Sequence, residues 1–184
     1  MSRPHLVWLL LVCAPLVLDG PVTAEGVAPV VAVGETPRPA ASGLDAAGVA
    51  AIVGRANPDL SAEELVRIGA AVVRYGDKYG LDPELVTAVL LVESGGRPWA
   101  VSPKGAMGLM QVMPYMSSRL GLVGNYSTIE SNIEAGCMIL AENIDRFGEE
   151  RGILAYFWGP DIRGDAYLHR VQAARAEVRR RLES

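Results

Sequence analysis

From residue 59 onward, apolar residues recur every three or four positions, which is the spacing of helices that bury one face. The first stripe begins after Ser61 and Glu64, which form a capping box, and Gly80 is placed to end it. Its apolar positions are Leu65, Ile68, Val72, Tyr75 and Tyr79. This stretch therefore predicts an amphipathic helix that packs one face against a core.

The next segment predicts a helix that is buried on all sides. Asp82 offers a side-chain cap, and Pro83 occupies the first turn, where its missing N–H does no harm. Residues 85–92 are almost wholly apolar, so the helix presents no polar face to solvent. We expect it to end at Glu93 and Ser94, directly before two glycines.

The remaining pattern is also helical. The longest stripe follows a second capping box, Ser127 with Glu130, and ends at Gly148. Further helices are predicted over residues 105–113, 114–120, 153–157 and 165–182. No stretch alternates in the way of a strand between hairpin turns, although a strand or two around 100–112 stays open. We therefore predict an all-α domain over residues 59–184.

Residues 1–24 have the pattern of a signal peptide. A short polar start precedes the apolar run 6–18, which is shorter than the ~20 residues that span a membrane. The small residue Ala24 ends a suitable cleavage site, so we predict a mature N-terminus at Glu25. The protein is then exported, to the periplasm or cell envelope. An uncleaved membrane anchor is the alternative.

Residues 25–58 predict a flexible linker between the signal peptide and the helical domain. They are rich in Ala, Val, Gly and Pro and show no sustained helical stripe. One short helix is expected within them, near residues 44–55. The predicted organisation is thus a signal peptide, a linker and one helical domain.

Composition excludes several classes of function. The 184 residues carry 17 Lys and Arg against 21 Asp and Glu, and a net charge of −4 argues against a nucleic-acid binder. Two cysteines and two histidines do not form a metal cluster at ligand spacing, so neither a metal nor another cofactor is expected. Cys137, the thiol left after export, is expected to be buried and unreactive. A site built from carboxylates is not excluded.

Glu93 is the residue whose position best suits chemistry. It ends an apolar helix, and the helix dipole disfavours a negative charge at that end. Apolar surroundings also favour the neutral acid, so both effects raise its pKa. A carboxyl still protonated near neutral pH is able to act as a general acid. The alternative is an exposed glutamate held by a nearby cation such as Arg97.

A second candidate region covers residues 105–114, where glycines lie among apolar residues. Gln111 is a polar residue inside this run, and if buried it needs a partner, which a sugar amide or hydroxyl would supply. Methionines at every third position predict core, with one or two of them on the floor of an apolar cleft: Met107, Met110, Met113 and Met116.

Five short motifs follow one another through the domain. They are Glu93-Ser94, AVSPKGA at 100–106, GLMQVMP at 108–114, Asn132-Ile133 with Gly136, and Ala155-Tyr156 with Gly159-Pro160. In this order they resemble the soluble lytic transglycosylase (SLT) domain family, over about residues 80–170. The resemblance implies a lysozyme-like helical fold with a long cleft for the glycan strands of peptidoglycan.

The resemblance also implies roles for single residues. Glu93 matches the single catalytic glutamate of the family, and Ser94 matches the serine beside it, which helps to place the substrate. Gln111 and Met113 match positions that contact the sugar next to the scissile bond. Tyr156 matches a tyrosine whose hydroxyl lies near the catalytic carboxyl.

The implied activity is cleavage of the β-1,4 bond between N-acetylmuramic acid and N-acetylglucosamine without water. The glutamate protonates the leaving oxygen, then accepts the proton of the muramic 6-hydroxyl as that oxygen closes onto C1, which gives a 1,6-anhydromuramoyl end. One carboxyl is acid and base in turn, whereas ordinary glycosidases need two. Other acids stay open as cleft residues: Glu130, Glu134, Asp161 and Asp165.

The chain departs from the family pattern at a few positions. Phe157 and Trp158 replace an asparagine and an alanine, and Met116 stands where the family often has a threonine. We expect Phe157 to fill core, whereas core packing and stacking on sugar are both open for Trp158. Asn132 matches a family asparagine that we take to be mainly structural.

Two other functions stay open from the sequence. One is a hydrolytic muramidase of the goose-type lysozyme kind, in which water is the acceptor. The other is a non-catalytic peptidoglycan-binding component of an envelope or secretion machine. The basic C-terminal segment suits either a docking surface for such a partner or a solvated helix face, and no oligomeric state is predicted.

Overall fold

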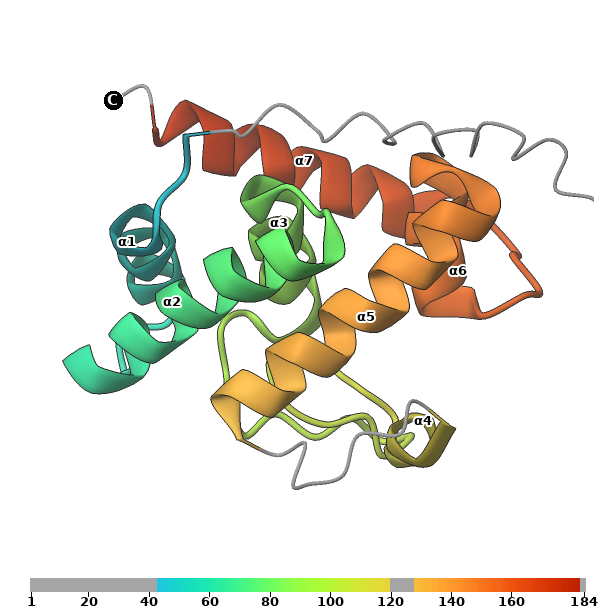
Figure 1. Cartoon of the computed structure of the whole chain (residues 1–184), viewed down its shortest axis with the longest axis horizontal. Helices are drawn as coiled ribbons and strands as arrows, with labels where there is room; N and C mark the ends of the chain where they lie inside the picture. Colours follow the sequence, from blue (N-terminus) through green and yellow to red (C-terminus); the bar gives the residue numbers. More distant parts are fainter. Residues whose placement is uncertain (1–42, 120–127, 183–184) are drawn as a thin grey trace, which may run out of the picture. The chain divides into compact units, whose positions relative to one another are not determined.

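The computed structural model describes residues 43–119 and 128–182, all within one compact unit, Glu35–Ser184. The described residues form helices and no strand, which confirms the all-α prediction (Figure 1). The helices are α1 (Ala46–Ala56), α2 (Ala62–Tyr79), α3 (Pro83–Ser94), α4 (Pro114–Arg119), α5 (Ile129–Phe147), α6 (Glu149–Trp158) and α7 (Ala166–Arg180). None of these helices is both long and apolar enough to cross a membrane. The predicted signal peptide lies outside the described residues.

The boundaries of α2 and α3 follow the caps that the sequence carries. Ser61 and Glu64 form both hydrogen bonds of the capping box at the start of α2. Gly80 ends that helix in the left-handed conformation, with φ at 66°. Asp82 caps α3 through its side chain, and Pro83 takes the first helical position. These four local predictions are confirmed.

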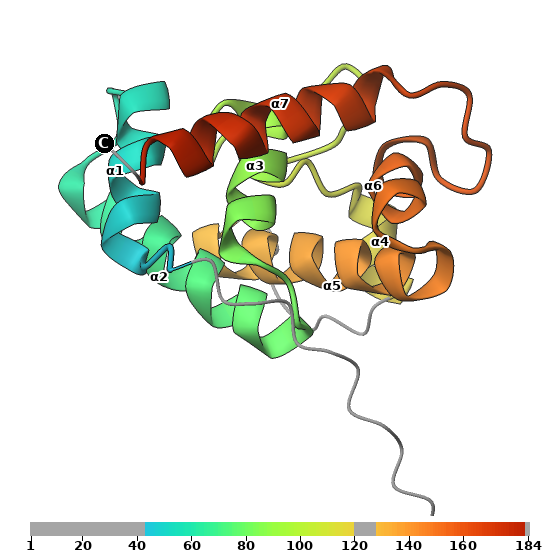
Figure 2. The ribbon, with the colours of Figure 1, turned by 90° about the horizontal axis from the view of Figure 1, so that it is seen from above.

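α3 is the buried helix of the fold. α7 packs along it, α1 and α2 also contact it, and Figure 2 shows α7 lying across α3. Five of its apolar residues are at most 2% exposed: Leu85, Val86, Ala88, Val89 and Leu90. Since each large apolar side chain contributes about 1.5–3 kcal/mol on full burial, this helix anchors whatever side chain stands at its end.

α1 is the short helix that was expected near residues 44–55, but it belongs to the packed core and not to a flexible linker. Its residues Val49, Ile52 and Val53 are buried in the same core as α2 and α3. The packing is close, because a Cβ on Gly69 of α2 would lie 2.1 Å from a backbone oxygen of α1. The folded domain therefore extends at least to Leu44, and the boundary predicted at residue 58 is corrected. A helix built largely from Ala and Gly packs through its backbone and carries little apolar periodicity.

Residues 105–113 form a loop and not the predicted helix. Gly105, Gly108 and Gln111 have φ values of 86°, 78° and 48°, which a right-handed helix does not accommodate. Two isolated antiparallel bridges, both made by Met107, fold this loop back on itself. The sequence had left open a strand or two around residues 100–112. In the described residues, this region forms only these two isolated bridges.

α5 begins one position later than its predicted capping box. Its N-cap is Thr128, which accepts a backbone hydrogen bond through its side chain, and Ser127 lies outside the described residues. Glu130, the other predicted member, instead accepts two hydrogen bonds from Arg67 of α2, at 2.7 and 2.8 Å. The helices predicted over 114–120, 153–157 and 165–182 are found as α4, α6 and α7.

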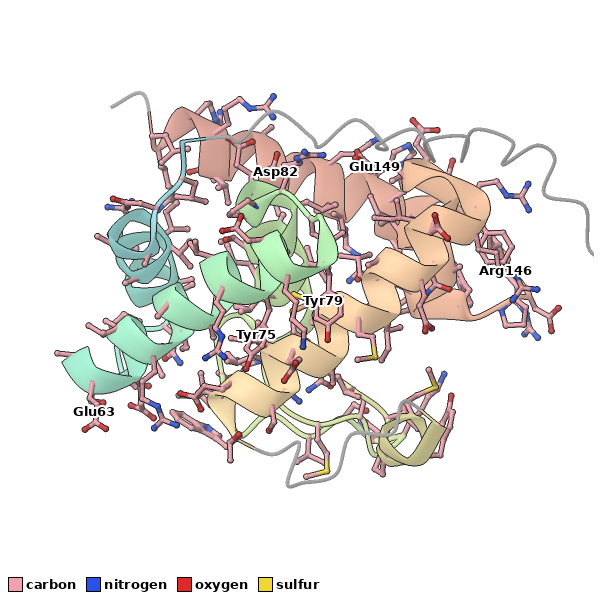
Figure 3. The ribbon with its side chains drawn as sticks, in the orientation of Figure 1. Glu63, Tyr75, Tyr79, Asp82, Arg146 and Glu149 are labelled. Carbon is pink, nitrogen blue, oxygen red and sulfur yellow. The ribbon has the colours of Figure 1, made fainter. Side chains whose placement is uncertain are left out.

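Two arginines of α7 join that helix to the start of α3. Arg175 Nη2 lies 2.8 Å from Asp82 Oδ2, and Arg175 Nη1 lies 2.9 Å from Glu149 Oε1; Figure 3 labels both acids. Arg179 Nη2 lies 2.8 Å from Glu84 Oε2. The Asp82 and Glu84 side chains are only 8% and 4% exposed, so both carboxylates are largely withdrawn from water, whereas the Arg179 side chain is 57% exposed. Part of the basic C-terminal segment therefore serves packing within the chain.

Candidate active site

Glu93 lies in the last turn of α3 and is half-buried. The helix ends at Gly95, whose left-handed φ of 62° turns the backbone away directly after the carboxyl group. The hydroxyl of Tyr167 donates a hydrogen bond to Glu93 Oε1 over 2.5 Å. Arg97, the cation of the alternative interpretation, is exposed and makes no ion pair with Glu93 in the structure described.

The pKa of Glu93 is raised above the ordinary value for glutamate, in the predicted direction. Burial is the largest cause, because it disfavours the charged form. The hydrogen bond from Tyr167 and the positive charge of Arg170 act in the opposite direction, since both favour the carboxylate. A larger fraction of Glu93 is therefore protonated near neutral pH than of an exposed glutamate.

Tyr167, in the first turn of α7, is the contact residue that sequence reasoning missed. Its side chain is 2% exposed, and its ring stacks on Phe157, with centroids 4.7 Å apart and planes at 15°. The Arg170 guanidinium lies 5.4 Å from the centre of the same ring. In the sequence, Tyr167 stands among apolar positions of an amphipathic helix and resembles core. Only the packing of α7 on α3 brings its hydroxyl to Glu93.

Tyr156 of α6 holds the loop beside the site. Its hydroxyl donates a hydrogen bond to the Met110 carbonyl oxygen over 2.7 Å. The pKa of Tyr156 is raised well above its usual value, first by burial and then by the negative charge of Glu93, so the hydroxyl remains a donor. The charge of Glu93 thus affects the pKa of Tyr156, although the Tyr156 hydroxyl donates its hydrogen bond to Met110 and not to Glu93. Its contact with substrate stays a prediction.

Ser94 is buried at the turn that follows Glu93. Its side chain is 1% exposed, and its hydroxyl donates to the Leu90 carbonyl oxygen over 3.1 Å. The Ser94 hydroxyl oxygen in turn accepts a hydrogen bond from the Gly96 backbone N–H at 3.1 Å. Both bonds stabilise the exit from α3 and so the position of the preceding carboxyl. A direct contact of Ser94 with substrate stays a prediction.

Asn132 of α5 holds the 105–113 loop in place through two hydrogen bonds of its side chain. Its Nδ2 donates to the Met107 carbonyl oxygen over 2.9 Å, and its Oδ1 accepts from the Met110 N–H at 2.8 Å. A Cβ on Gly108 would lie 2.5 Å from the Asn132 amide, so only glycine fits there. The side chain is 1% exposed, and the mainly structural role expected for this asparagine is confirmed.

Gln111 holds the same loop through its side chain. Its amide donates to the carbonyl oxygens of Ala100 and Gly108, at 3.1 and 3.0 Å. Gln111 and Met113 both line a pocket of about 670 Å³. Met110, directly before Gln111, is fully buried in the core. The structure thus brings two of the predicted sugar-contacting residues to one wall, and their contact with sugar stays a prediction.

The pocket lies between the loop, α4, α5 and α6. Phe157, which was expected to fill core, is 47% exposed and lines the pocket, as does Trp158 at 38%. Both belong to the last turn of α6, beyond the buried residues that pack against α5, and this explains the correction. Glu93 does not itself line the pocket. Phe157, which does, stacks on Tyr167, and the Tyr167 hydroxyl donates a hydrogen bond to the Glu93 carboxyl.

The other acids considered from the sequence lie elsewhere. They are Glu130, Glu134, Asp161 and Asp165. Glu130 pairs with Arg67, which lowers its pKa, and Glu134 pairs with Lys78 at 2.5 Å. Figure 3 shows Tyr75 and Tyr79 of α2 on the side where α2 meets α5, the region of these pairs. The two aspartates are exposed, and none of the four acids lines the pocket.

Cys137 is a free, fully buried thiol whose pKa is raised by burial, which confirms the expected buried position. Within residues 43–119 and 128–182, no group of three or more His, Cys, Asp or Glu side chains is placed to hold a metal ion.

Known proteins are similar to parts of this chain in sequence. The transglycosylase of Enterobacteria phage PRD1 is 44% identical over 93 residues, which cover 50% of this chain and 33% of the relative. The endo-type membrane-bound lytic murein transglycosylase A of Klebsiella pneumoniae subsp. pneumoniae is 40% identical over 63 residues, or 34% of this chain and 31% of the relative. The alignments thus span about one third of the length of these relatives.

Two solved structures are similar to this chain. The lytic transglycosylase Slt of Pseudomonas aeruginosa, an inactive mutant, matches 61% of this chain and 22% of its own, with 26% identity and a TM-score of 0.43. The 70 kDa soluble lytic transglycosylase of Escherichia coli matches the same shares with 24% identity and a TM-score of 0.47. The profile of the transglycosylase SLT domain matches residues 71–176, from α2 into α7. Because this match covers more than half of the sequence, the chain belongs to the transglycosylase SLT domain family.

Proposed function

We propose that this chain is a peptidoglycan lytic transglycosylase that is exported to the periplasm or cell envelope. The observation that carries the proposal is Glu93, a half-buried carboxyl with a raised pKa at the glycine-terminated end of α3. The names of the relatives support the substrate, since one of them is a membrane-bound lytic murein transglycosylase. The bond to be cleaved is the β-1,4 linkage from N-acetylmuramic acid to N-acetylglucosamine.

In the first step Glu93 acts as a general acid. Its proton passes to the glycosidic oxygen while the bond from muramic C1 to that oxygen breaks, and the N-acetylglucosamine end leaves as an alcohol. In the second step the carboxylate accepts the proton of the muramic 6-hydroxyl as that oxygen bonds to C1. The product is a 1,6-anhydromuramoyl end, Glu93 has regained its proton, and no water is consumed.

Tyr167 orients the carboxyl for both steps. Its hydroxyl holds Glu93 Oε1, which leaves Oε2 without a hydrogen bond from the described residues. The proton to be transferred can therefore reside on Oε2. The pKa of Tyr167 lies far above its usual range because of burial, so its hydroxyl remains a donor throughout.

The opposing influences on Glu93 suit a group that has to be acid and base in turn. Burial favours the protonated form needed for the first step, whereas Tyr167 and Arg170 favour the carboxylate needed for the second. A catalytic pKa near the working pH allows both forms to be populated. This balance distinguishes the site from one that holds a permanently charged carboxylate.

The neighbouring residues would place the glycan strand. Gln111 and Met113 contact the sugar next to the scissile bond from the pocket wall that they share. Tyr156 keeps the Met110 carbonyl in place, and Ser94 fixes the turn beside the carboxyl. Placement of a substrate by such fixed groups is a large part of the catalytic effect of an enzyme.

The experiment is a digestion of purified peptidoglycan with the chain, followed by mass spectrometry of the released sugar ends. Anhydromuramoyl ends that form with the wild-type chain but not with Glu93→Gln are the expected result. Reducing ends would instead identify a hydrolytic muramidase of the goose-type lysozyme kind. Binding without any release by the wild-type chain would indicate a non-catalytic peptidoglycan-binding component.

A further inference from the structure

An aromatic cluster joins the end of α6 to the start of α7, next to Glu93. The Phe157 ring stacks on the Tyr167 ring, with centroids 4.7 Å apart. The Trp158 ring stands nearly perpendicular to Phe157, at 4.9 Å. The Arg170 guanidinium lies 5.4 Å from the centre of the Tyr167 ring and 5.8 Å from that of Phe157, so it spans the stacked pair. Tyr167 is thus in contact with both an aromatic ring and a cation.

The first turn of α7, which carries Tyr167, has no side-chain cap. Its N-cap residue, Asp165, makes no capping hydrogen bond to the N–H groups of this turn. The Trp158 indole N–H donates instead to the Gly164 carbonyl oxygen over 3.2 Å, directly before the helix begins. The contacts of the Tyr167 ring therefore help to fix a helix start that lacks the usual anchor.

The groups that act on Glu93 differ in charge. Tyr167 of α7 and Tyr156 of α6 both remain neutral, because burial raises the pKa of each. Cys137 of α5, which interacts with Tyr156, is neutral for the same reason. Arg170 is thus the charged side chain that acts on Glu93 in the part of the chain that the structure describes. It forms no salt bridge there, so its guanidinium is held by the two rings alone.

We propose that Phe157 and Arg170 are positioning residues, which hold the Tyr167 ring so that its hydroxyl stays on Glu93 Oε1. The inference deepens the proposed function, on which the catalytic role of Glu93 rests. The hydroxyl is the atom of tyrosine farthest from the backbone, so a small rotation about the Cα–Cβ bond moves it out of hydrogen-bond distance. A stacked ring and a nearby cation resist that rotation.

The pKa of Glu93 reports this contact whether or not the chain acts on a substrate. It can be measured by ¹³C NMR titration of the side-chain carboxyls, with the Glu93 signal assigned by its loss in Glu93→Gln. The Tyr167 hydrogen bond and the Arg170 charge both favour the carboxylate, so losing either raises the pKa of Glu93. We expect Phe157→Leu and Arg170→Met to raise it. Phe157→Tyr and Arg170→Lys, which keep the ring and the charge, should leave it near the wild-type value.

A Tyr167→Phe background separates positioning from a direct effect of charge. Phe157→Leu should change the pKa of Glu93 no further there, because the hydroxyl through which Phe157 acts is gone. Arg170→Met should retain only the part of its effect that its charge exerts directly. Arg74→Met is the matched control: this exposed arginine of α2 lies 5.4 Å from the centre of the Tyr75 ring, and its loss should leave the pKa of Glu93 unchanged.

Kinetics on soluble glycan strands give a second measurement. We expect Phe157→Leu to lower kcat by about three- to tenfold, the scale of one aromatic pair, with KM nearly unchanged. The alkaline limb of the pH–rate profile should move to higher pH, as the raised pKa of Glu93 requires. Phe157 lines the pocket and is 47% exposed, so a residue that only stacks on sugar would instead raise KM at constant kcat.

That kinetic pattern would overturn the proposal. An unchanged pKa of Glu93 in Phe157→Leu, or an equal change with and without the Tyr167 hydroxyl, would overturn it as well. Circular dichroism establishes that each variant is folded, and Arg170→Met, which alters an exposed residue, carries the test if Phe157→Leu does not fold. A failure of the proposed function shows separately, as the absence of anhydromuramoyl ends in the wild-type digestion, and leaves the titration result standing.

Discussion

The two ends of α3 carry acidic side chains that face the same helix, α7, in opposite electrostatic settings. At the first end, Glu84 accepts two hydrogen bonds from Arg179 at 3.1 and 2.8 Å, and Asp82 pairs with Arg175. At the C-terminal end, Glu93 accepts a hydrogen bond from the uncharged hydroxyl of Tyr167 and has no ion pair among the described residues.

The dipole of α3 accounts for the different settings of the acids at its two ends. The dipole of α3 favours negative charge at its start and disfavours it at its end. Paired acids at the start stabilise the fold, whereas the carboxyl at the end, which forms no ion pair among the described residues, is available for the proton transfers that we propose. Arg175, Arg179 and Tyr167 all belong to α7. The ion pairs at the start of α3 therefore also help to fix the position of α7 along α3, which places Tyr167 beside Glu93 at the end of α3.

The largest effect is expected from Glu93→Gln, which removes the group that distinguishes the reactive end. A positioned acid or base typically contributes ~10²–10⁴-fold, and in the proposed mechanism one carboxyl serves both purposes. We expect the rate of anhydromuramoyl release to fall by at least about that range, with a melting temperature that is unchanged or slightly raised. A variant that releases these ends at nearly the wild-type rate would show that another acid is the catalyst.

Tyr167→Phe tests the uncharged partner of Glu93. Loss of a hydrogen bond to a charged group costs ~1.5–3 kcal/mol, so we expect kcat/KM to fall by about tenfold or more. The lost bond favoured the carboxylate, so the pKa of Glu93 should rise further, and the alkaline limb of the pH–rate profile should move to higher pH. A pH profile identical to that of the wild type would show that Tyr167 only fills space.

Arg175→Met tests the paired end of the helix. The change keeps an apolar stem but leaves Asp82, whose side chain is 8% exposed, without its arginine. We expect the free energy of unfolding to fall by about 1–3 kcal/mol, seen as a lower melting temperature. Arg180→Met, which removes an arginine that is 72% exposed, is the control and should leave the melting temperature nearly unchanged. Equal effects of both changes would contradict the importance of the buried pairs.

The smallest effect concerns the dependence of stability on pH. Because the pKa of Glu93 is raised in the folded state, the folded chain holds its proton more tightly than the unfolded chain does. This contribution is full below the unfolded pKa and is lost as pH rises through the folded pKa. Relative to wild type, Glu93→Gln should therefore gain stability as pH rises across this interval, as measured by urea unfolding. A difference that is constant with pH would show that Glu93 ionises normally.

Much of the fold could be predicted from local sequence. The capping box of Ser61 with Glu64, the Asp82 cap and the left-handed Gly80 act within a few residues, and each predicted a helix boundary that the structure confirms. The errors also have local causes. The short helix expected near residues 44–55 is found at 46–56, but its small residues gave no sign that it packs into the core. Residues 105–113 have apolar spacing but three left-handed positions.

Within the site, the sequence alone determined that an acidic residue ends a buried helix just before two glycines. That is sufficient to single out Glu93, because burial and the helix end act on it through its own segment. Only the tertiary structure decided which groups meet it. Tyr167 reaches Glu93 across 74 positions of sequence, and Phe157 turns to the pocket because the packing face of α6 ends before it. Such contacts depend on how α3, α6 and α7 pack, and no short-range pattern records the packing of helices that are distant in the chain.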